Sequence, residues 1–400
     1  MKWFRGDTMQ KKELKQNSFL NGAFVATMGI VITKILGMLY VIPFYAIIGE
    51  QGGALYGYAY TIYLLFQSLS CAGIPNAISK IISEYQTLGY SKAKEKTFKI
   101  GRRLAIFMGV FVFVILFLFA PIIAKAIIGD LTGGNTLSDV TYVIRVIATA
   151  ILVVPILSIY RGYLEGHKFI TPTAFSQVIE QVARIIVIIF GSYAALNIFH
   201  LSLTTAVGVA TFGATAGALV GYLYLLNKIF KHKKEINNIT ATKEEKEIST
   251  KEILGKIFFY ALPFIMIDVF KSAYNFVDMT TLVKTLVHKA GYTTIAAENS
   301  MSVISTWGNK LNMIIVSIST GIIISLIPNL TASSVKGDKK DVHHKINQTL
   351  QILLFLSVPM TIGLSFLSKP VWDVFYGNRS AVGAEIMAYY IFVALIISTY

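Results

Sequence analysis

The residues of this chain that could do chemistry are charged side chains inside long apolar segments. Lys34 lies in the middle of the apolar stretch 17–48. An ammonium group at the centre of a membrane span costs about 2.5–3.5 kcal/mol, and Lys34 is too far from either end of the stretch to reach the polar interface easily. We therefore predict that Lys34 faces a hydrated cavity between helices, the alternative being a lysine that snorkels to the interface. An ammonium group in such a cavity could bind a ligand electrostatically.

A second polar stripe runs along the apolar segment 257–283. Asp268, Lys271, Asn275 and Asp278 follow one another at spacings of 3, 4 and 3 residues, which places them on one face of a helix. A polar face inside an apolar helix must meet polar partners or water. We predict that this stripe lines a cavity; the alternative is an Asp268–Lys271 pair that neutralises itself and only fixes packing.

Two further segments carry charges. Glu180 and Arg184 form an i,i+4 pair flanked by Gln177 and Gln181, and this pair is either structural or part of a cavity wall. Lys310 lies in the segment 301–327, whose polar face lines the cavity or makes ordinary hydrogen bonds between helices. That face also carries Ser302, Thr306, Trp307 and Asn309. In all, seven of the 36 basic residues fall within apolar segments. They are Lys34, Lys80, Lys125, Arg145, Arg184, Lys271 and Lys310, of which Lys80 and Lys125 lie near segment ends.

The sequence shows no constellation for covalent chemistry. Cys71 is the only cysteine, so neither a disulfide nor a cysteine-based zinc site can form. The six histidines are scattered, and the adjacent pair His343 and His344 falls in a polar loop. No GxxxxGK[ST] motif is present. We expect a protein that is not an enzyme and that holds no metal and no cofactor.

The composition places the chain in a membrane. Hydrophobic residues make up 54% of the 400 residues and charged residues 14%, with a mean hydropathy of +0.63, whereas soluble domains carry about 25% charged residues. We predict an all-α integral membrane protein with ten spans. They are 17–48, 55–82, 104–128, 142–160, 173–195, 204–227, 257–283, 301–327, 347–368 and 384–400. The apolar run still open at Tyr400 suggests a sequence that continues beyond it.

Lysine and arginine in alternate loops predict the orientation. The loops on one side, which include residues 1–16, hold 25 of them, and the loops on the other side hold four. The positive-inside rule therefore predicts a cytoplasmic N-terminus. The same loops account for the net charge of +15: they face anionic lipid headgroups, and nothing requires a nucleic-acid partner.

An internal repeat predicts two lobes. Ile74-Pro75-Asn76 closes the second span, and Ile327-Pro328-Asn329 closes the eighth. Six spans separate the copies, so both halves point the same way, as in two-lobed transporters. We predict a six-helix lobe over 1–227, a basic linker over 228–256 that could form an amphipathic surface helix, and a second lobe over 257–400.

Small residues and prolines shape the predicted spans. Gly213, Gly217 and Gly221 form a doubled GxxxG motif, which is typical of close helix packing. Prolines in the interior of spans should bend them. Among them are Pro43, Pro155, Pro263 and Pro359.

Several motifs resemble a known family. The stretches 33–37 (TKILG), 54–60 (ALYGYAY) and 73–76 (GIPN) are similar to the first two helices of a polysaccharide-export family of Gram-positive bacteria. The stretch 160–166 (YRGYLEG), followed by 172–174 (PTA) and 176–181 (SQVIEQ), is the more specific match. The chain resembles the YtgP and stage V sporulation protein B group, which is similar to MurJ-type lipid II flippases of the multidrug/oligosaccharidyl-lipid/polysaccharide (MOP) superfamily.

This resemblance implies two helical lobes, usually of 14 helices in total, around a V-shaped central cavity. It implies that an undecaprenyl-pyrophosphate-linked cell-wall precursor is moved from the inner to the outer leaflet. The family's helix-one cation before Leu-Gly matches Lys34, but the charged pair of the Gram-negative branch is replaced here by Tyr40 and Val41. The last two family helices, proposed to hold the lipid tail, would lie beyond this sequence.

The resemblance matches only Lys34 to a family residue; the charges of the other residues give them candidate roles in such a flippase. The cations Lys34, Arg184, Lys271 and Lys310 would contact the pyrophosphate. Glu180, Asp268 and Asp278 would keep these cations charged or bind a coupling ion. Cell-wall synthesis machinery is a further candidate partner.

Two other functions stay open. One is a cation-coupled multidrug exporter of the same superfamily, although four candidate cations against three acids favour an anionic substrate. The other is a structural membrane protein that scaffolds cell-wall enzymes, in which the buried charges would be idle.

Overall fold

The structure is a computed structural model that describes residues 19–71, 73–130, 132–236, 247–316, 339–377 and 381–399, and these residues are almost entirely helical. The chain begins with α1 (Phe19–Leu39), α2 (Val41–Cys71), α3 (Ile74–Thr87), α4 (Ser91–Ile128), α5 (Leu137–Gly166), α6 (Ile170–Ile186), the π-helical turns η1 (Val187–Gly191) and η2 (Ala194–Ile198), α7 (Leu203–Lys231) and α8 (Lys233–Ile236). It continues with α9 (Thr250–Ala290), α10 (Thr294–Ser302), the π-helical turn η3 (Val303–Trp307), α12 (Lys339–Phe366), α13 (Ser368–Tyr376) and α14 (Ala381–Thr399).

The predicted first span is interrupted. The helix breaks at Tyr40 between α1 and α2, three residues before Pro43, which has no backbone N–H to continue the ladder to Leu39. A second break lies inside α2 at Gly49, whose φ of 65° is a left-handed conformation that suits glycine. The boundary between the first two predicted spans therefore falls at Gly49.

The prediction that Ile74-Pro75-Asn76 closes a span extending to residue 82 is wrong. The helix ends at Cys71, and these residues open the separate helix α3, with Pro75 in its first turn. Proline is favoured there because the N–H it lacks would have no partner. The second copy, Ile327-Pro328-Asn329, lies outside the described residues.

The predicted linker is partly helical. α7 continues to Lys231, the single turn α8 follows, and α9 begins at Thr250 behind the N-cap residue Ser249. α9 then runs without interruption to Ala290, beyond the predicted end at residue 283. Residues 237–246 lie outside the description.

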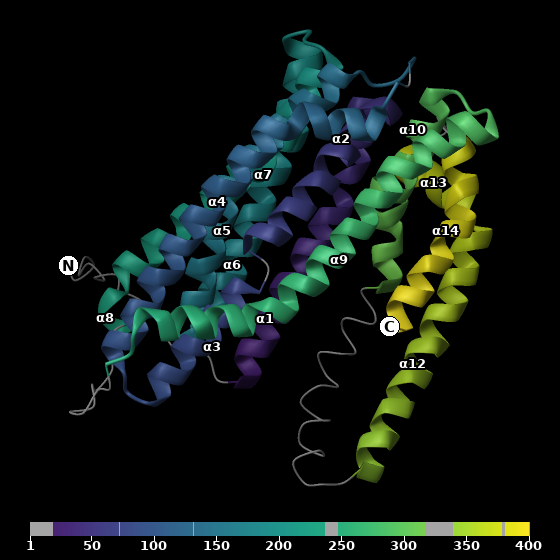
Figure 1. Ribbon diagram of the computed structural model, residues 1–400. Helices are drawn as coiled ribbons and strands as arrows, with labels where there is room; N and C mark the ends of the chain where they lie inside the picture. Colours follow the sequence, from purple (N-terminus) through teal and green to yellow (C-terminus); the bar gives the residue numbers. More distant parts are fainter. Residues whose placement is uncertain are drawn as a thin grey trace, which may run out of the picture.

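The helices form two groups (Figure 1). α1 to α7 pack side by side in one group. α10, η3 with the helical residues that follow it, and α12 to α14 form the other group. α9 contacts α2, α3 and α4 of the first group and α10 of the second. The groups meet where α10 lies against α2, which we call the α10 end. The opposite end, where α3, α8 and the start of α12 lie, is the α8 end.

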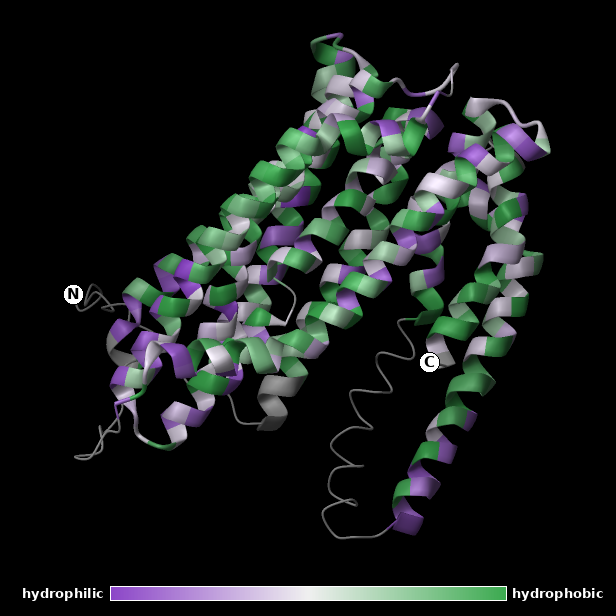
Figure 2. Ribbon diagram, in the orientation of Figure 1, coloured by the Kyte–Doolittle hydropathy of each residue, from purple (hydrophilic) through white to green (hydrophobic). Residues whose placement is uncertain are grey.

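Length and hydropathy identify the membrane-spanning helices. Within the described residues, six helices are long and apolar enough to cross a membrane, or seven if the bent α1–α2 pair counts as one span. Figure 2 shows apolar residues along the middle of the long helices and hydrophilic ones toward the α8 end. The chain is thus an all-helical, multi-pass membrane protein, as predicted.

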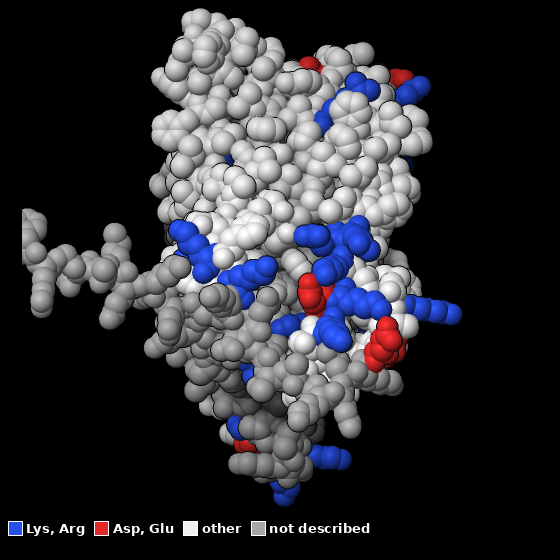
Figure 3. All heavy atoms as spheres, turned by 90° about the vertical axis from the view of Figure 1, so that its left-hand side faces the viewer, with Lys and Arg blue, Asp and Glu red and all other residues white. Residues whose placement is uncertain are grey.

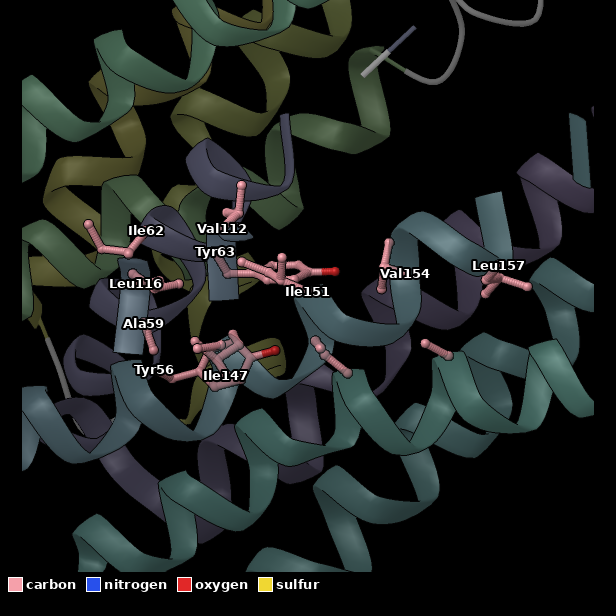
Figure 4. Packing of buried hydrophobic residues seen from close by; sticks show 14 of the residues in the cluster. Tyr56, Ala59, Ile62, Tyr63, Val112, Leu116, Ile147, Ile151, Val154 and Leu157 are labelled. Atoms are coloured by element: carbon pink, nitrogen blue, oxygen red, sulfur yellow. The ribbon is translucent and has the colours of Figure 1, made fainter. Parts of the chain in front are cut away.

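The core of the larger group centres on α2, α4 and α5. Ile62 of α2, Leu116 of α4 and Ile147 and Ile151 of α5 have no measurable exposure, and Figure 4 shows them interleaved with Tyr56 and Tyr63. This packing fixes α2, whose tyrosines border the candidate site.

Candidate functional site

The glycine stripe of α7 positions the charged residues of α6. A Cβ atom added at Gly217 would lie 2.6 Å from the carbonyl oxygen of Glu180, and one at Gly213 would lie 3.1 Å from that of Arg184. The two backbones can approach this closely only because these positions lack a side chain. The predicted packing role of this GxxxG motif is confirmed.

A buried ionic triad lies at the junction of α5 and α6. Arg161 Nη2 and Arg184 Nη2 each donate to one carboxylate oxygen of Glu180, both at 2.8 Å. The three side chains are only 14–16% exposed, and Arg161 also donates to Ser176 Oγ at 2.9 Å. The predicted Glu180–Arg184 pair is present, and the second arginine also has the carboxylate of Glu165 within electrostatic reach.

Arg184 lies within electrostatic reach of a cation from the other helix group. Its guanidinium lies within electrostatic reach of Lys310, which is half-buried in the helical residues that follow η3. Lys310 Nζ sits 5.7 Å from the centre of the Tyr40 ring, a distance compatible with a cation–π contact. Tyr56, Tyr60 and Tyr63 of α2 lie within electrostatic reach of the same guanidinium. Two of the four predicted cations thereby lie within electrostatic reach of each other and close to tyrosines.

The structure places Lys34 on α1, beside α6. α1 and α6 run in the same direction, because Gly29 abuts Ala174 and Gly37 abuts Gln181. Lys34 is half-buried and lies one turn before Gly37. It therefore stands at the border of the α1–α6 contact, close to the level of the triad.

The polar stripe of α9 faces α2 across a small cavity. Asp268, Lys271 and Asn275 line a space of about 300 Å³ together with Gln67 and Cys71 of α2. Neither Arg184 nor Lys310 lines this space. In the part of the chain that the structure describes, no ion pair joins Asp268 to Lys271, and both side chains are exposed. The lining of this cavity agrees with the prediction for the stripe, and the role of the two charges stays a prediction. Asp278 lies farther along α9, within electrostatic reach of Tyr390 of α14.

The polar face after residue 301 packs against α2. Ser305 and Thr306 abut Gly57, where an added Cβ would lie within 2.9 Å of both hydroxyl oxygens. Ser302 donates to the carbonyl of Asn299, and Asn309 is exposed. Apart from Lys310, these residues agree with the alternative that the polar face of this segment takes part in helix packing.

Acidic residues connect the two helix groups at the α10 end. Glu298 of α10 is 2% exposed and accepts hydrogen bonds from Asn135 N at 3.0 Å, Asn135 Nδ2 at 2.9 Å and Tyr58 Oη at 3.4 Å. Glu298 lies outside the predicted spans, and burial raises the pKa of its carboxyl to about 7. A second contact joins Asn299 to Glu50.

Trp307 completes the contact at this end. A Cβ atom added at Gly53 would lie 2.3 Å from the Trp307 indole. The centre of the indole ring lies 4.9 Å from that of the Tyr45 ring and 5.7 Å from that of the Tyr376 ring. Tyr376 Oη also donates to the Trp307 carbonyl at 2.9 Å. The two helix groups are closed against each other at the α10 end.

The structure describes no residues that would hold a metal ion. Within the described ranges, no group of three or more His, Cys, Asp or Glu side chains is arranged for one.

The helix arrangement is that of MOP-superfamily transporters. It superposes on "Lipid II flippase MurJ, inward closed conformation" with a TM-score of 0.66 at 16% identity, covering 94% of this chain and 74% of that one. It superposes equally well on an inward-facing multidrug resistance MATE family transporter of the MOP superfamily, with a TM-score of 0.66 at 12% identity, covering 94% and 84%. These similarities establish the fold.

Sequence similarity establishes the family. Residues 19–329 match the family model described as polysaccharide biosynthesis protein, and the chain belongs to this family. It is 37% identical over 391 residues to the lipid II flippase MurJ of Bacillus subtilis (strain 168), covering 96% of this chain and 71% of that protein. It is 25% identical to stage V sporulation protein B of the same organism, covering 94% and 70%. The family resemblance deduced from the sequence motifs is confirmed.

Proposed function

We propose that this protein is a transporter that moves lipid II, or a related undecaprenyl-pyrophosphate-linked cell-wall precursor, across the cytoplasmic membrane. The family and the 37% identical flippase relative support this substrate class. The observation that carries the proposal is that Arg184 and Lys310, two cations on different helix groups, lie within electrostatic reach of each other. The protein performs no covalent chemistry in this account.

A pyrophosphate fits the charge of this site. Two facing cations repel each other in a low-dielectric interior, and an anion between them removes that repulsion. Arginine offers a planar fork of donors and lysine a mobile point charge, both suited to phosphate oxygens. The surrounding tyrosine hydroxyls can donate further hydrogen bonds. An organic cation, the substrate of a multidrug exporter, would meet repulsion instead.

The other predicted residues keep proposed roles. Lys34 on α1 and Lys271 on α9 would contact the pyrophosphate at other stages of its passage. Glu180 would hold the two arginines in place, and Asp268 and Asp278 would keep the lysines charged or bind a coupling ion. Enzymes of cell-wall synthesis are the proposed partners that receive the translocated precursor.

Alternating access would use the two helix groups as lobes. Residues 1–227 would form one lobe, 257–400 the other and 228–256 the linker, rocking about the site as in two-lobed transporters. Contacts such as Glu298–Asn135 would then have to open at the α10 end for the precursor to leave.

Lys310→Gln is expected to lower the transport rate about tenfold or more. A hydrogen bond to a charged group contributes about 1.5–3 kcal/mol, and every 1.4 kcal/mol is a factor of ten. The measurement is survival of cells depleted of their resident lipid II flippase and complemented with the variant, together with flipping of a fluorescent lipid II in liposomes.

Lys125→Gln is the matched control, since Lys125 is an exposed lysine near the end of the apolar helix α4. Full activity of Lys310→Gln, or equal losses in both variants, would remove the binding role of Lys310. Failure of the wild-type protein to rescue, combined with altered drug accumulation on its deletion, would favour the multidrug exporter.

The α8 end and the N-terminus are proposed to lie in the cytoplasm, because the loops at that end carry most of the lysine and arginine. In a Cys71→Ser background, Lys99→Cys reports on the α8 end and Tyr292→Cys on the α10 end. A membrane-impermeant maleimide should label Tyr292→Cys in intact cells and Lys99→Cys only after permeabilisation. The reverse pattern would invert the orientation.

A further inference from the structure

A cavity at the α8 end lies away from the Arg184–Lys310 pair. It occupies about 490 Å³ between α4, α5, α7 and α8, a size typical of small-ligand sites. α4 and α7 both pack on α5, so α5 forms the floor and the other two helices form the walls. The floor is aromatic: Phe98 of α4 lies 5.2 Å from the Tyr160 ring and 4.2 Å from the Tyr163 ring.

The rim of this cavity is strongly basic. Five cations line it, against a single carboxylate. They are Lys92, Lys94, Lys99, Arg102 and Lys233. The carboxylate, Glu95, pairs with Lys99 at 2.8 Å. Figure 3 shows lysine and arginine side chains gathered on the side of the molecule that carries α4, α7 and α8, with few acidic side chains among them.

One of these cations is built into the wall. Lys94 is only 4% exposed, and its ammonium donates to Gln86 Oε1 at 3.2 Å. Burial of a lysine costs free energy unless an anion is near. Among the described residues, the one carboxylate within electrostatic reach of Lys94 is Glu95, which is already paired with Lys99, so the rim keeps a surplus of positive charge. The cavity therefore favours an anionic ligand.

Apolar side chains continue the walls toward the membrane. Ile106 lies one turn beyond Arg102 on α4, and Leu223 one turn before Leu226 on α7. Both are exposed, at 44% and 60%, and Phe230 at the cavity is 74% exposed. Exposed apolar side chains on membrane helices contact acyl chains, so the cavity opens where headgroups and acyl chains meet.

We propose that this cavity binds the phosphate headgroup of an anionic phospholipid in the leaflet at the α8 end, with its acyl chains along α4 and α7. The basic rim pairs with the phosphate and the aromatic floor holds the glycerol backbone. Basic pockets between membrane helices are the sites at which anionic headgroups are recognised. The bound lipid is a resident ligand, distinct from the transported precursor.

The test compares two neighbouring arginines. Arg102 lines the cavity, whereas Arg103, also exposed, is not among its lining residues. Native mass spectrometry of the purified full chain, released from micelles containing phosphatidylglycerol or phosphatidylcholine, measures the lipid-bound fraction. The wild type should prefer phosphatidylglycerol. Arg102→Gln should weaken that binding about fivefold and Lys92→Gln/Arg102→Gln about 25-fold, while Arg103→Gln leaves it unchanged.

Other outcomes would overturn the proposal. Equal losses in Arg102→Gln and Arg103→Gln would mean a diffuse surface charge. Competition by glycerol phosphate as effective as the lipid would mean a soluble phosphate site. Undecaprenyl pyrophosphate bound through Arg102 in place of phosphatidylglycerol would assign the cavity to the substrate. Since the readout is binding, a failed transport assay leaves this result unaffected, and unchanged melting temperatures of the variants exclude misfolding.

Discussion

Glu180→Gln is expected to lower the free energy of unfolding by about 3–5 kcal/mol, because it leaves Arg161 and Arg184 buried without the carboxylate that joins them. Both guanidinium groups are about 15% exposed, so water replaces the lost charge only in part. The measurement is denaturation of the detergent-solubilised protein, followed by tryptophan fluorescence.

Glu95→Gln provides the matched control. Glu95 also forms a 2.8 Å ion pair one helical turn away, with Lys99, but these two side chains are 68% and 56% exposed. Such surface pairs contribute about 0–1 kcal/mol. A double variant Glu180→Gln/Arg161→Gln should recover part of the loss, since one buried charge is then removed. Equal stability of Glu180→Gln and Glu95→Gln would show that water, and not the carboxylate, solvates the arginines.

One residue of the triad, Arg161, lies outside the span predicted from hydropathy. Glu180 and Arg184 share one helix, so their spacing alone predicted the pair. The predicted span 142–160 leaves Arg161 in a loop, whereas α5 continues to Gly166. Gly162 and Gly166 explain the extra turns: an added Cβ would lie 2.5 Å from the Pro75 carbonyl and 2.8 Å from that of Ser79, so the end of α5 is held against α3.

The sequence predicted a helix break near the start of the chain but not the residue at which it occurs. Pro43 indicated a bend, and the break occurs at Tyr40, which brings the Tyr40 ring under Lys310. Hydropathy could not place this break because residues on both sides of it are apolar. The left-handed conformation at Gly49 was missed for the same reason.

The sequence did not predict the contacts between distant segments of the chain. Glu298 lies in a region that the sequence assigned to a polar loop, where an acid attracts no notice. Its burial depends on α10 packing against α2 and on Asn135, which is 163 residues away. A single sequence carries no signal for such a pairing, whereas helical periodicity is enough to place Asp268, Lys271 and Asn275 on one face of α9.

The closed α10 end is expected to open more readily as the pH rises from 5 to 8. Burial raises the pKa of Glu298 to about 7, whereas in an open, hydrated state it would titrate near 4.5. The closed state therefore binds the proton more tightly, so its advantage is complete below about 4.5 and is lost as the pH rises through 7. Between these two pH values, the free energy of the closed state relative to the open state rises by about 2–3 kcal/mol.

The groups that face this carboxyl support that sign. Tyr58 of α2 and the Asn135 amide donate to it, while Asp139 of α5, within electrostatic reach, repels its ionised form. The described groups around it include no cation that would hold the carboxylate charged in the closed state. Ionisation therefore places a negative charge in a buried site near another one.

Spin labels at Ser138→Cys and Tyr292→Cys, in a Cys71→Ser background, report the separation of the two helix groups at this end, because both positions are exposed there. The long-distance population should grow with pH in the otherwise unchanged protein and stay constant in Glu298→Gln. Asp130→Asn, which removes an exposed carboxylate between α4 and α5, should retain the pH response. If the distance distribution is independent of pH, or if acid rather than base widens it, the protonated Glu298 does not hold the α10 end closed.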